Sequence, residues 1–348
     1  MATGTVLGTV GGVYSIELPS GETIEAVLRG RLKRNKRSDD RVVTGDDVRV
    51  SFQDGQHVID GVEPRRSQLE RRAPGPGRHR PKIIVANVQR VLLVFAAARP
   101  EPNARTLDRF LVLTESSELD AVIILNKVDL LPAEQVSAFL APYRAAGYRT
   151  LGTSVVSGEG MSELRALLCT GRSVLTGPSG VGKSSLLNSI QPGLGLRIGE
   201  VSEAVGKGKH TTVASRLIRL ECGGYVADTP GLREVGMWEV ERAHLAECFP
   251  ELRALRGQCR FDDCSHTHEP GCAVRDAVAA GRIAAPRYES YFALREEETA
   301  CSPRQAGPDR DHAAGRREVE HLLVVRAQQV AHAHRQLGVS PAQRRPIT

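Results

Sequence analysis

The first 65 residues alternate between apolar and polar positions with the period of two that half-buried β-strands require. Three such runs are centred on Ile16, Ala26 and Val50, and turn-forming residues such as Gly21 and Gly55 separate them. Short strands at this spacing are typical of a small barrel. We therefore predict an all-β domain over residues 1–65, with the OB-fold as the expected topology.

The pattern changes near residue 82, where continuous apolar runs replace the alternation. These runs lie at 83–86, 91–95 and 121–125. Strands buried on both faces have this character, and amphipathic helices are predicted after the last two of them, at 106–117 and 134–147. Apolar strands that alternate with helices predict a doubly wound parallel sheet, which we assign to residues 82–240.

The last part of the chain divides into two stretches. Residues 241–300 are predicted to form a small helical domain, with helices at 273–281 and 288–298. Residues 301–348 begin with a segment rich in Pro, Gly, Arg and Asp, which predicts a largely disordered tail. A helix at 319–337 is expected within the tail, whose function the sequence does not reveal.

Charge adds a class of partner to this picture. The 348-residue chain has a formal net charge of +6, which favours polyanions. Six basic residues and no acid lie between Arg29 and Arg37, within the predicted barrel. We interpret them as a contact with a nucleic-acid backbone; a solvated loop is the alternative. A second basic stretch, residues 66–81, is interpreted as a mobile linker because it contains Pro74 and Gly75.

Targeting and redox signals predict a cytoplasmic protein. No apolar run approaches the roughly 18–20 residues of a membrane span, and no signal-peptide pattern is found, so we expect a soluble monomer without a membrane partner. Three of the seven cysteines cluster with histidines, which favours metal ligation over disulfides. The other four are interpreted as isolated packing residues: Cys169, Cys222, Cys248 and Cys301.

A phosphate-binding motif begins at Gly177, between a predicted strand and a predicted helix. Its glycines, with Lys183 and Ser184, fit the spacing G-x-x-x-x-G-K-[ST]. Backbone N–H groups can converge there on an anion beside a helix N-terminus, while Lys183 neutralises phosphate and Ser184 ligates Mg²⁺. A glycine-rich turn without a ligand is the alternative. The predicted nucleotide contacts are Gly177, Pro178, Ser179, Gly180, Val181, Gly182, Lys183, Ser184 and Ser185.

A base-reading motif precedes this loop in the chain. Asn126, Lys127 and Asp129 fit the GTPase pattern N-K-x-D at the predicted end of a strand. The Asp129 carboxylate is expected to accept hydrogen bonds from guanine N1–H and N2–H₂, which adenine does not offer. Asn126 is expected to brace the loop, and Lys127 to lie over the ring. Ser154 and Val155 resemble the S-A loop behind the guanine. A plain turn at the end of a strand is the alternative for each motif.

Two switch motifs follow the P-loop. Thr212, in a loop rich in Gly and Lys, is predicted to close on Mg²⁺ and the γ-phosphate, with Thr211 as the alternative. Asp228 and Gly231 fit D-x-x-G, in which the aspartate holds Mg²⁺ through water and the glycine N–H meets the γ-phosphate. Mg²⁺ is therefore predicted to be bound by Ser184, Thr212 and Asp228.

The order of these motifs is permuted. An ordinary GTPase places the P-loop and both switches before N-K-x-D, whereas N-K-x-D comes first in this chain. The same sheet can be built from a permuted chain, because contacts rather than connectivity define it. The permutation ties the segment after the second switch directly to the element that senses the γ-phosphate.

A metal site is predicted in the helical domain. Three thiols and one imidazole provide the donor set of a tetrahedral structural Zn²⁺ site, from Cys259, Cys264, His266 and Cys272. His268 is the alternative to His266. A segment this small, with few apolar residues, folds poorly unless a metal ion or another cross-link stabilises it. Reduced cysteines in a small core are the competing interpretation.

Together these features resemble the RsgA (YjeQ) family of circularly permuted GTPases over about residues 5–298. The resemblance rests on the permuted order, the P-loop, the two switch sequences at 208–212 and 228–232, and the Cys/His spacing. It implies an N-terminal OB-fold and a C-terminal zinc domain that grip the rRNA of the small ribosomal subunit. It also implies GTP hydrolysis, stimulated by that subunit, during late maturation. Gln89 and Val155 depart from the family pattern, and the tail has no family counterpart.

The residue after D-x-x-G bears on catalysis. Many GTPases carry a water-orienting Gln there, but this chain has Leu232, which cannot orient water. Slow intrinsic hydrolysis and activation by a partner are therefore predicted. His210 is the local substitute to which the family resemblance also points, beside Lys183 and Thr212 as catalytic residues. Contact between His210 and an rRNA phosphate is the alternative role.

Two other classes of function compete with a GTPase. A P-loop ATPase or small-molecule kinase is disfavoured by N-K-x-D, and competition between GTP and ATP separates the two. A non-catalytic RNA-binding module is disfavoured by Lys183, Ser184 and Asp228. A single hydrolysis measurement separates it from an enzyme.

Overall fold

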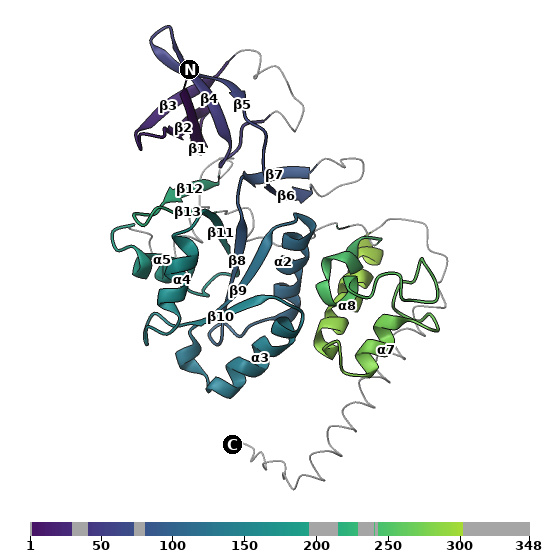
Figure 1. The fold of residues 1–348 in the computed structure, drawn as a ribbon. Helices are drawn as coiled ribbons and strands as arrows, with labels where there is room; N and C mark the ends of the chain where they lie inside the picture. Colours follow the sequence, from purple (N-terminus) through teal and green to yellow (C-terminus); the bar gives the residue numbers. More distant parts are fainter. Residues whose placement is uncertain are drawn as a thin grey trace. The chain divides into compact units, whose positions relative to one another are not determined.

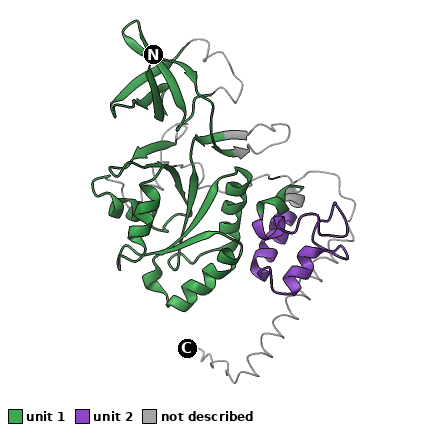
Figure 2. Ribbon diagram, viewed as in Figure 1, with its two compact units in different colours: residues 1–248 green, residues 249–348 purple. Residues whose placement is uncertain are grey.

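A computed structural model of the chain describes residues 2–29, 41–72, 81–194, 215–228, 240 and 243–301. The chain forms two compact units, residues 1–248 and residues 249–348 (Figure 2). All the described strands belong to the first unit, and the described part of the second unit is helical (Figure 1).

A closed barrel forms the N-terminal part of the first unit. Its strands are β1 (Ala2–Val10), β2 (Val13–Glu17), β3 (Thr23–Leu28), β4 (Asp47–Gln53) and β5 (Gln56–Val62), in the order β1-β2-β3-β5-β4. Val6, Ile16 and Ile59 are fully buried in its core, because alternate residues of each strand face inward. The predicted N-terminal barrel is confirmed. Phe52, with 66% of its surface exposed, is an exception to the expected alternation.

A small separate sheet follows the barrel. Strand β6 (Gln68–Arg72) pairs antiparallel with β7 (Pro81–Ala86). Two predictions are therefore wrong: part of the expected linker is a strand, and the apolar run 83–86 does not join the parallel sheet. The apolar side chains are covered nevertheless, since Leu69 and Val85 are fully buried in the core that β8 shares with the helix that follows it. Most of the basic loop predicted in the barrel, residues 30–40, lies outside the described residues.

A six-stranded sheet forms the centre of the first unit, in the order β10-β9-β8-β11-β13-β12. Its strands are β8 (Arg90–Ala96), β9 (Asp120–Asn126), β10 (Arg149–Thr153), β11 (Arg172–Thr176), β12 (Arg216–Arg219) and β13 (Tyr225–Asp228). Neighbouring strands run parallel, except that β12 is antiparallel to β13 at the edge. The predicted doubly wound parallel sheet is confirmed, with one antiparallel edge strand.

Helices cover both faces of this sheet (Figure 1). They are α2 (Ala104–Ser116) and α3 (Ala133–Ala145) on one face, and α4 (Met161–Leu168) and α5 (Lys183–Ile190) on the other. Successive residues of a strand point to opposite faces. In β8, Val91, Leu93 and Phe95 therefore join the core under α2 and α3. Leu92 and Val94 join the core under α4 and α5, which explains the continuous apolar run.

The second unit contains three described α-helices, α6 (Pro250–Arg253), α7 (Ala273–Ala279) and α8 (Ala285–Cys301). Arg287 is only 1% exposed. Its Nε lies 2.7 Å from Glu251 Oε1, and its guanidinium lies over the Phe249 ring at 4.6 Å. A buried charge requires such partners, so this contact fixes α6 against α8. Among the described residues, no helix combines the length and apolar character that crossing a bilayer requires.

A disulfide joins Cys169, directly after α4, to Cys222, in the turn between β12 and β13, with the Cα atoms 5.2 Å apart. The prediction that these two are isolated packing residues in a chain without disulfides is wrong. They lie 53 positions apart in sequence, and only the pairing of strands brings them together. Cys248 is buried and lies outside this disulfide, and its thiol donates to the His244 carbonyl oxygen at 3.6 Å.

We expect loss of this disulfide to destabilise the first unit. The chain-entropy model gives a loop of this length a stabilisation of about 4 kcal/mol, which corresponds to roughly 10 °C in melting temperature. Dithiothreitol, or the double substitution Cys169→Ala/Cys222→Ala, should lower the melting temperature accordingly, and thiol titration in denaturant should count the bond. Cys248→Ala is the matched control and should retain the effect of reductant. A melting temperature independent of reductant in the wild type would contradict the prediction.

Candidate functional site

The carboxyl ends of five parallel strands, β8 to β11 and β13, lie along one edge of the sheet. The P-loop follows β11, Asn126 ends β9, Ser154 follows β10 and Asp228 ends β13. Ligands of open α/β sheets bind at this edge. The structure therefore brings together motifs that the sequence presents as separate segments.

Glycine is required at two positions of the P-loop. Gly177 has a φ of 144°, and a Cβ there would meet the Val94 carbonyl oxygen at 2.0 Å. Gly182 has a φ of 98°, and its Cβ would lie 2.4 Å from Asn126 Nδ2. Helix α5 begins directly after Gly182. The loop thus ends at a helix N-terminus, where backbone N–H groups favour an anion.

Lys183 lies against the P-loop itself. Its Nζ donates hydrogen bonds to the carbonyl oxygens of Gly177 and Pro178 at 2.7 and 2.6 Å. Phosphate oxygens are charged and accept stronger hydrogen bonds than these carbonyl oxygens do. A bound phosphate can therefore replace the two carbonyl oxygens as the partner of the ammonium group. Ser184 is buried in the first turn of α5, and the Val181 side chain is buried beneath the loop.

Asn126, which is 3% exposed, connects the base-reading loop to the P-loop. Its Nδ2 donates to the Val181 carbonyl oxygen at 2.9 Å, and its Oδ1 accepts from Thr153 Oγ1 at 3.1 Å. The side-chain amide therefore braces two loops at once. Thr153, the last residue of β10, is a site residue that sequence analysis missed. Its one signal is its position directly before Ser154.

Lys127 makes a second connection between the two loops. Its backbone is left-handed, with a φ of 61°, and its Nζ donates to the Gly180 carbonyl oxygen at 2.7 Å and to the Arg99 carbonyl oxygen. Arg99 and Pro100 follow β8, and Pro100 Cδ lies 3.7 Å from the position of a Cβ on Gly180. None of the sequence motifs indicates this loop, for which an Arg-Pro pair just after an apolar strand is the available signal.

Ser154 orients the base-reading carboxylate. Its Oγ donates to Asp129 Oδ1 at 2.5 Å, and it accepts the N–H groups of Val156 and Ser157 at 3.1 Å each. One donor and two acceptor positions exhaust a hydroxyl group, so the buried serine has no remaining freedom. Asp129 itself is exposed at the edge. Val155, 40% exposed, lies in the same turn.

Most of the remaining predicted site residues lie outside the part of the chain that the structure describes. His210, Thr211, Thr212 and Gly231 lie outside the described residues, as does Leu232. Asp228 ends β13, where its backbone pairs with Leu175 of β11, two residues before the P-loop. The backbone thus places Asp228 one strand away from the phosphate-binding loop.

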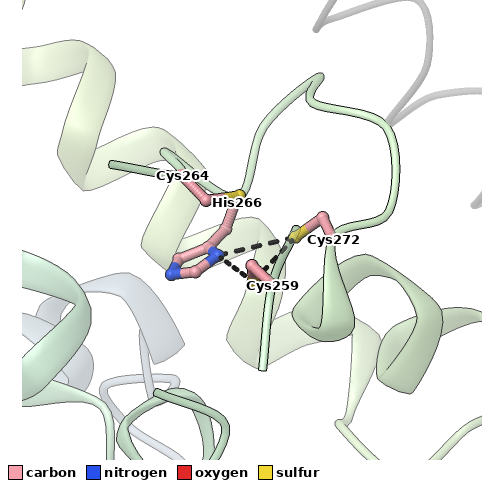
Figure 3. A group of neighbouring side chains, drawn as sticks. All are labelled: Cys259, Cys264, His266 and Cys272. Atoms are coloured by element: carbon pink, nitrogen blue, oxygen red, sulfur yellow. Dashed lines mark hydrogen bonds between the residues drawn. The ribbon is translucent and has the colours of Figure 1, made fainter. Parts of the chain in front are cut away.

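The four predicted metal ligands gather in the second unit (Figure 3), with ligand atoms within 4.8 Å of one another: Cys259, Cys264, His266 and Cys272. Cys259 Sγ and Cys272 Sγ lie 3.9 Å apart, and each lies 3.5 Å from His266 Nδ1. Tetrahedral Zn²⁺, with bonds of about 2.3 Å to sulfur and about 2.0 Å to nitrogen, separates two sulfur ligands by about 3.8 Å and a sulfur from a nitrogen ligand by about 3.5 Å. The donor set and the spacing therefore fit one such ion. The alternative ligand, His268, is exposed outside the cluster.

Neighbouring side chains hold the loop that carries these ligands. The Glu269 carboxylate accepts three backbone N–H groups of the loop, those of Ser265, Thr267 and His268. The hydroxyls of Tyr288 and Tyr291 donate to the carbonyl oxygens of His266 and Ser265 at 2.7 and 2.8 Å. These bonds stabilise the left-handed backbone of His266, whose φ is 59°.

Burial sets the protonation of the cluster. It raises the pKa of the Cys264 and Cys272 thiols and lowers the pKa of the His266 imidazole. The neutral imidazole offers a lone pair, whereas the buried thiols require a cation to become thiolates. Burial also acts to raise the pKa of Glu269, but hydrogen bonds from Ser265 and the loop N–H groups outweigh it and lower this pKa to about 2.

Known proteins resemble this chain in sequence over most of its length. The model of the RsgA GTPase family matches residues 62–238. A protein of Gemmatimonas aurantiaca named small ribosomal subunit biogenesis GTPase RsgA is 50% identical over 299 residues, which cover 85% of this chain and 97% of the relative. A protein of Moorella thermoacetica with the same name is 44% identical over 295 residues, which cover 84% and 96%.

Solved structures show the same architecture. YjeQ from Thermotoga maritima is 33% identical, with a TM-score of 0.72 over 87% of this chain and 99% of that one. YloQ, described as a circularly permuted GTPase, is 29% identical, with a TM-score of 0.69 over 88% and 97%. The chain therefore belongs to the RsgA GTPase family and is a circularly permuted enzyme that hydrolyses GTP.

Proposed function

We propose that this GTPase acts in late maturation of the small ribosomal subunit, binds rRNA through its barrel and its metal-bearing unit, and hydrolyses GTP faster on the subunit. The names of relatives that align over nearly their whole length support the subunit as partner. The basic residues near Arg29 and the net charge of +6 support contact with RNA. The proposal includes a monomer that works in the cytoplasm, where the proposed partner is assembled.

The observation that carries the nucleotide part of the proposal is the brace from Asn126 to the P-loop. It joins the loop that carries Asp129, the proposed base-reading residue, to the phosphate-binding loop. We assign Lys183 to the phosphates, and Ser184, Thr212 and Asp228 to Mg²⁺. His210 is the proposed partner-dependent catalytic residue. The metal in the second unit is proposed to be one structural Zn²⁺.

GTP turnover with and without purified small ribosomal subunits tests the central proposal. We expect slow intrinsic turnover, because Leu232 cannot orient water, and a marked increase on adding subunits. The increase should fade between about 50 and 200 mM salt, since contacts with phosphates release counterions. Turnover that subunits leave unchanged would contradict the ribosomal part of the proposal.

Two variants serve as controls in this assay. Lys183→Ala should abolish turnover under both conditions. His210→Ala should lower stimulated turnover, and stimulated turnover equal to that of the wild type would exclude a catalytic role for His210. An unstimulated wild type that still hydrolyses GTP would leave the GTPase assignment intact.

Guanine recognition is tested by Asp129→Asn. The change replaces a carboxylate acceptor with an amide that cannot accept both guanine N–H groups, and hydrogen bonds to charged groups are worth about 1.5–3 kcal/mol each. We expect the affinity for GTP to fall on the order of 100-fold, and the preference over ATP to shrink with it, in competition with a fluorescent nucleotide. Asp120→Asn, at the other end of β9, is the matched control. Unchanged discrimination in Asp129→Asn would refute the assignment.

Metal content tests the proposed zinc site in the second unit. Purified protein should release about one zinc ion per chain, measured by mass spectrometry, as expected for one Cys₃His site. Cys272→Ala should lose the ion and unfold the second unit at a lower temperature, because metal binding supplies folding free energy. Cys248, a buried cysteine of the first unit outside the Cys/His cluster, provides a control, and Cys248→Ala should keep its zinc. A zinc-free wild type with a fully folded second unit would contradict the assignment.

A further inference from the structure

Glu17, at the end of barrel strand β2, points out of the barrel and is nevertheless 7% exposed. Both of its oxygens are used by the hairpin of β12 and β13. Oε1 lies 2.6 Å from Arg219 Nη1, and Oε2 accepts the Tyr225 hydroxyl at 2.5 Å. Arg219 and Tyr225 are directly paired across the hairpin. One barrel carboxylate therefore contacts both strands of the hairpin, at two residues that are directly paired with each other.

The neighbouring strand is held in the same way. Arg172, the first residue of β11, donates to the Gly45 carbonyl oxygen at 2.9 Å, and to Asp47 Oδ1 and Thr5 Oγ1 at 2.8 Å each. Its guanidinium lies over the Tyr225 ring at 5.9 Å. The barrel thus contacts the first residues of two adjacent parallel strands, β11 and β13.

A third contact lies near the end of the hairpin at which β13 terminates. Thr44 Oγ1 donates to the Ser215 carbonyl oxygen at 2.7 Å, directly before β12. The next residue, Arg216, pairs with Asp228. The hairpin therefore touches the barrel at both ends of β12, between the segment that contains the first switch and the segment that begins the second.

The strands connect these barrel contacts to the edge of the sheet that carries the nucleotide-binding motifs. Tyr225 begins β13 and Asp228 ends it, a distance of about 10 Å along an extended chain. A paired strand cannot change its register without shifting every residue by a whole position. The carboxylate that holds Tyr225 therefore constrains the first residue of the strand whose backbone ends at Asp228, next to the strand that leads into the P-loop.

We propose that Glu17 is a positioning residue for GTP hydrolysis: through Tyr225 and β13, the barrel carboxylate aligns Asp228 for its Mg²⁺ ion. The inference rests on the proposed role of Asp228 in Mg²⁺ binding. Burial, and then the hydrogen bond to Glu17, raise the pKa of Tyr225, so the hydroxyl stays protonated and remains a donor. A buried carboxylate without this donor would be poorly satisfied, which makes the arrangement specific.

The test is the Mg²⁺ dependence of intrinsic GTP turnover, without subunits or RNA, and, as a readout independent of turnover, the Mg²⁺ dependence of binding of a fluorescent, non-hydrolysable GTP analogue. Glu17→Gln and Tyr225→Phe should each raise the Mg²⁺ concentration for half-maximal turnover about fivefold or more. The KM for GTP at saturating Mg²⁺ should change less than twofold, because the P-loop strand is still held by Arg172. The double variant should be no worse than the poorer single one, since both changes weaken the same contact between Glu17 and Tyr225. A merely structural contact would lower stability without shifting the Mg²⁺ requirement.

Matched variants separate the possible outcomes. Glu63→Gln removes a carboxylate from an exposed barrel ion pair with Arg49 and should behave as the wild type does. Tyr225→Phe leaves the Glu17–Arg219 ion pair intact and remains informative if Glu17→Gln does not fold. Wild-type Mg²⁺ dependence in Tyr225→Phe, or an equal shift in Glu63→Gln, would overturn the inference. Full turnover in Asp228→Asn would instead show that the proposed Mg²⁺ role is wrong, and the inference would be overturned with it.

Discussion

The candidate nucleotide site is organised around the hydrogen bond from the Asn126 side chain to the Val181 carbonyl oxygen. It joins the base-reading loop to the phosphate-binding loop across 55 positions of sequence. The approach is possible only because Gly182 has no Cβ, which would lie 2.4 Å from the Asn126 amide nitrogen. Lys127 adds a parallel connection through the Gly180 carbonyl oxygen. Loops braced in this way hold their contacts for base and phosphate at a fixed separation, which lowers the ordering cost of binding.

The parallel sheet determines what the nucleotide edge is connected to. Strands β11 and β13 carry nucleotide motifs at their carboxyl ends and barrel contacts at their amino ends. Because neighbouring hydrogen-bonded strands move together, these two strands form a continuous structural path between the barrel and the candidate GTPase site. The permuted order of motifs means that the unit with the Cys/His cluster follows the second switch motif in sequence.

Buried charges mark the places where separate elements are joined. Glu17 joins the barrel to the β12–β13 hairpin, and Arg287 joins α8 to Glu251 of α6. Removing a charge from water is costly, and a partner only offsets that cost. Such contacts therefore add less to stability than to specificity, since a displaced partner would leave an uncompensated charge. Apolar packing, as around Phe95 in the sheet, provides most of the stability.

The sequence by itself determined the chemistry and the fold class of this protein. The P-loop, N-K-x-D and Cys/His motifs depend on residue types at short spacing, and barrel and sheet strands have distinct local periodicities. Only the tertiary structure decided that the run 83–86 pairs outside the large sheet, that Cys169 meets Cys222, and that Glu17 faces Tyr225. The physical reason is that strand pairing and contacts between distant residues depend on which surfaces meet in the fold, and no local pattern records that choice.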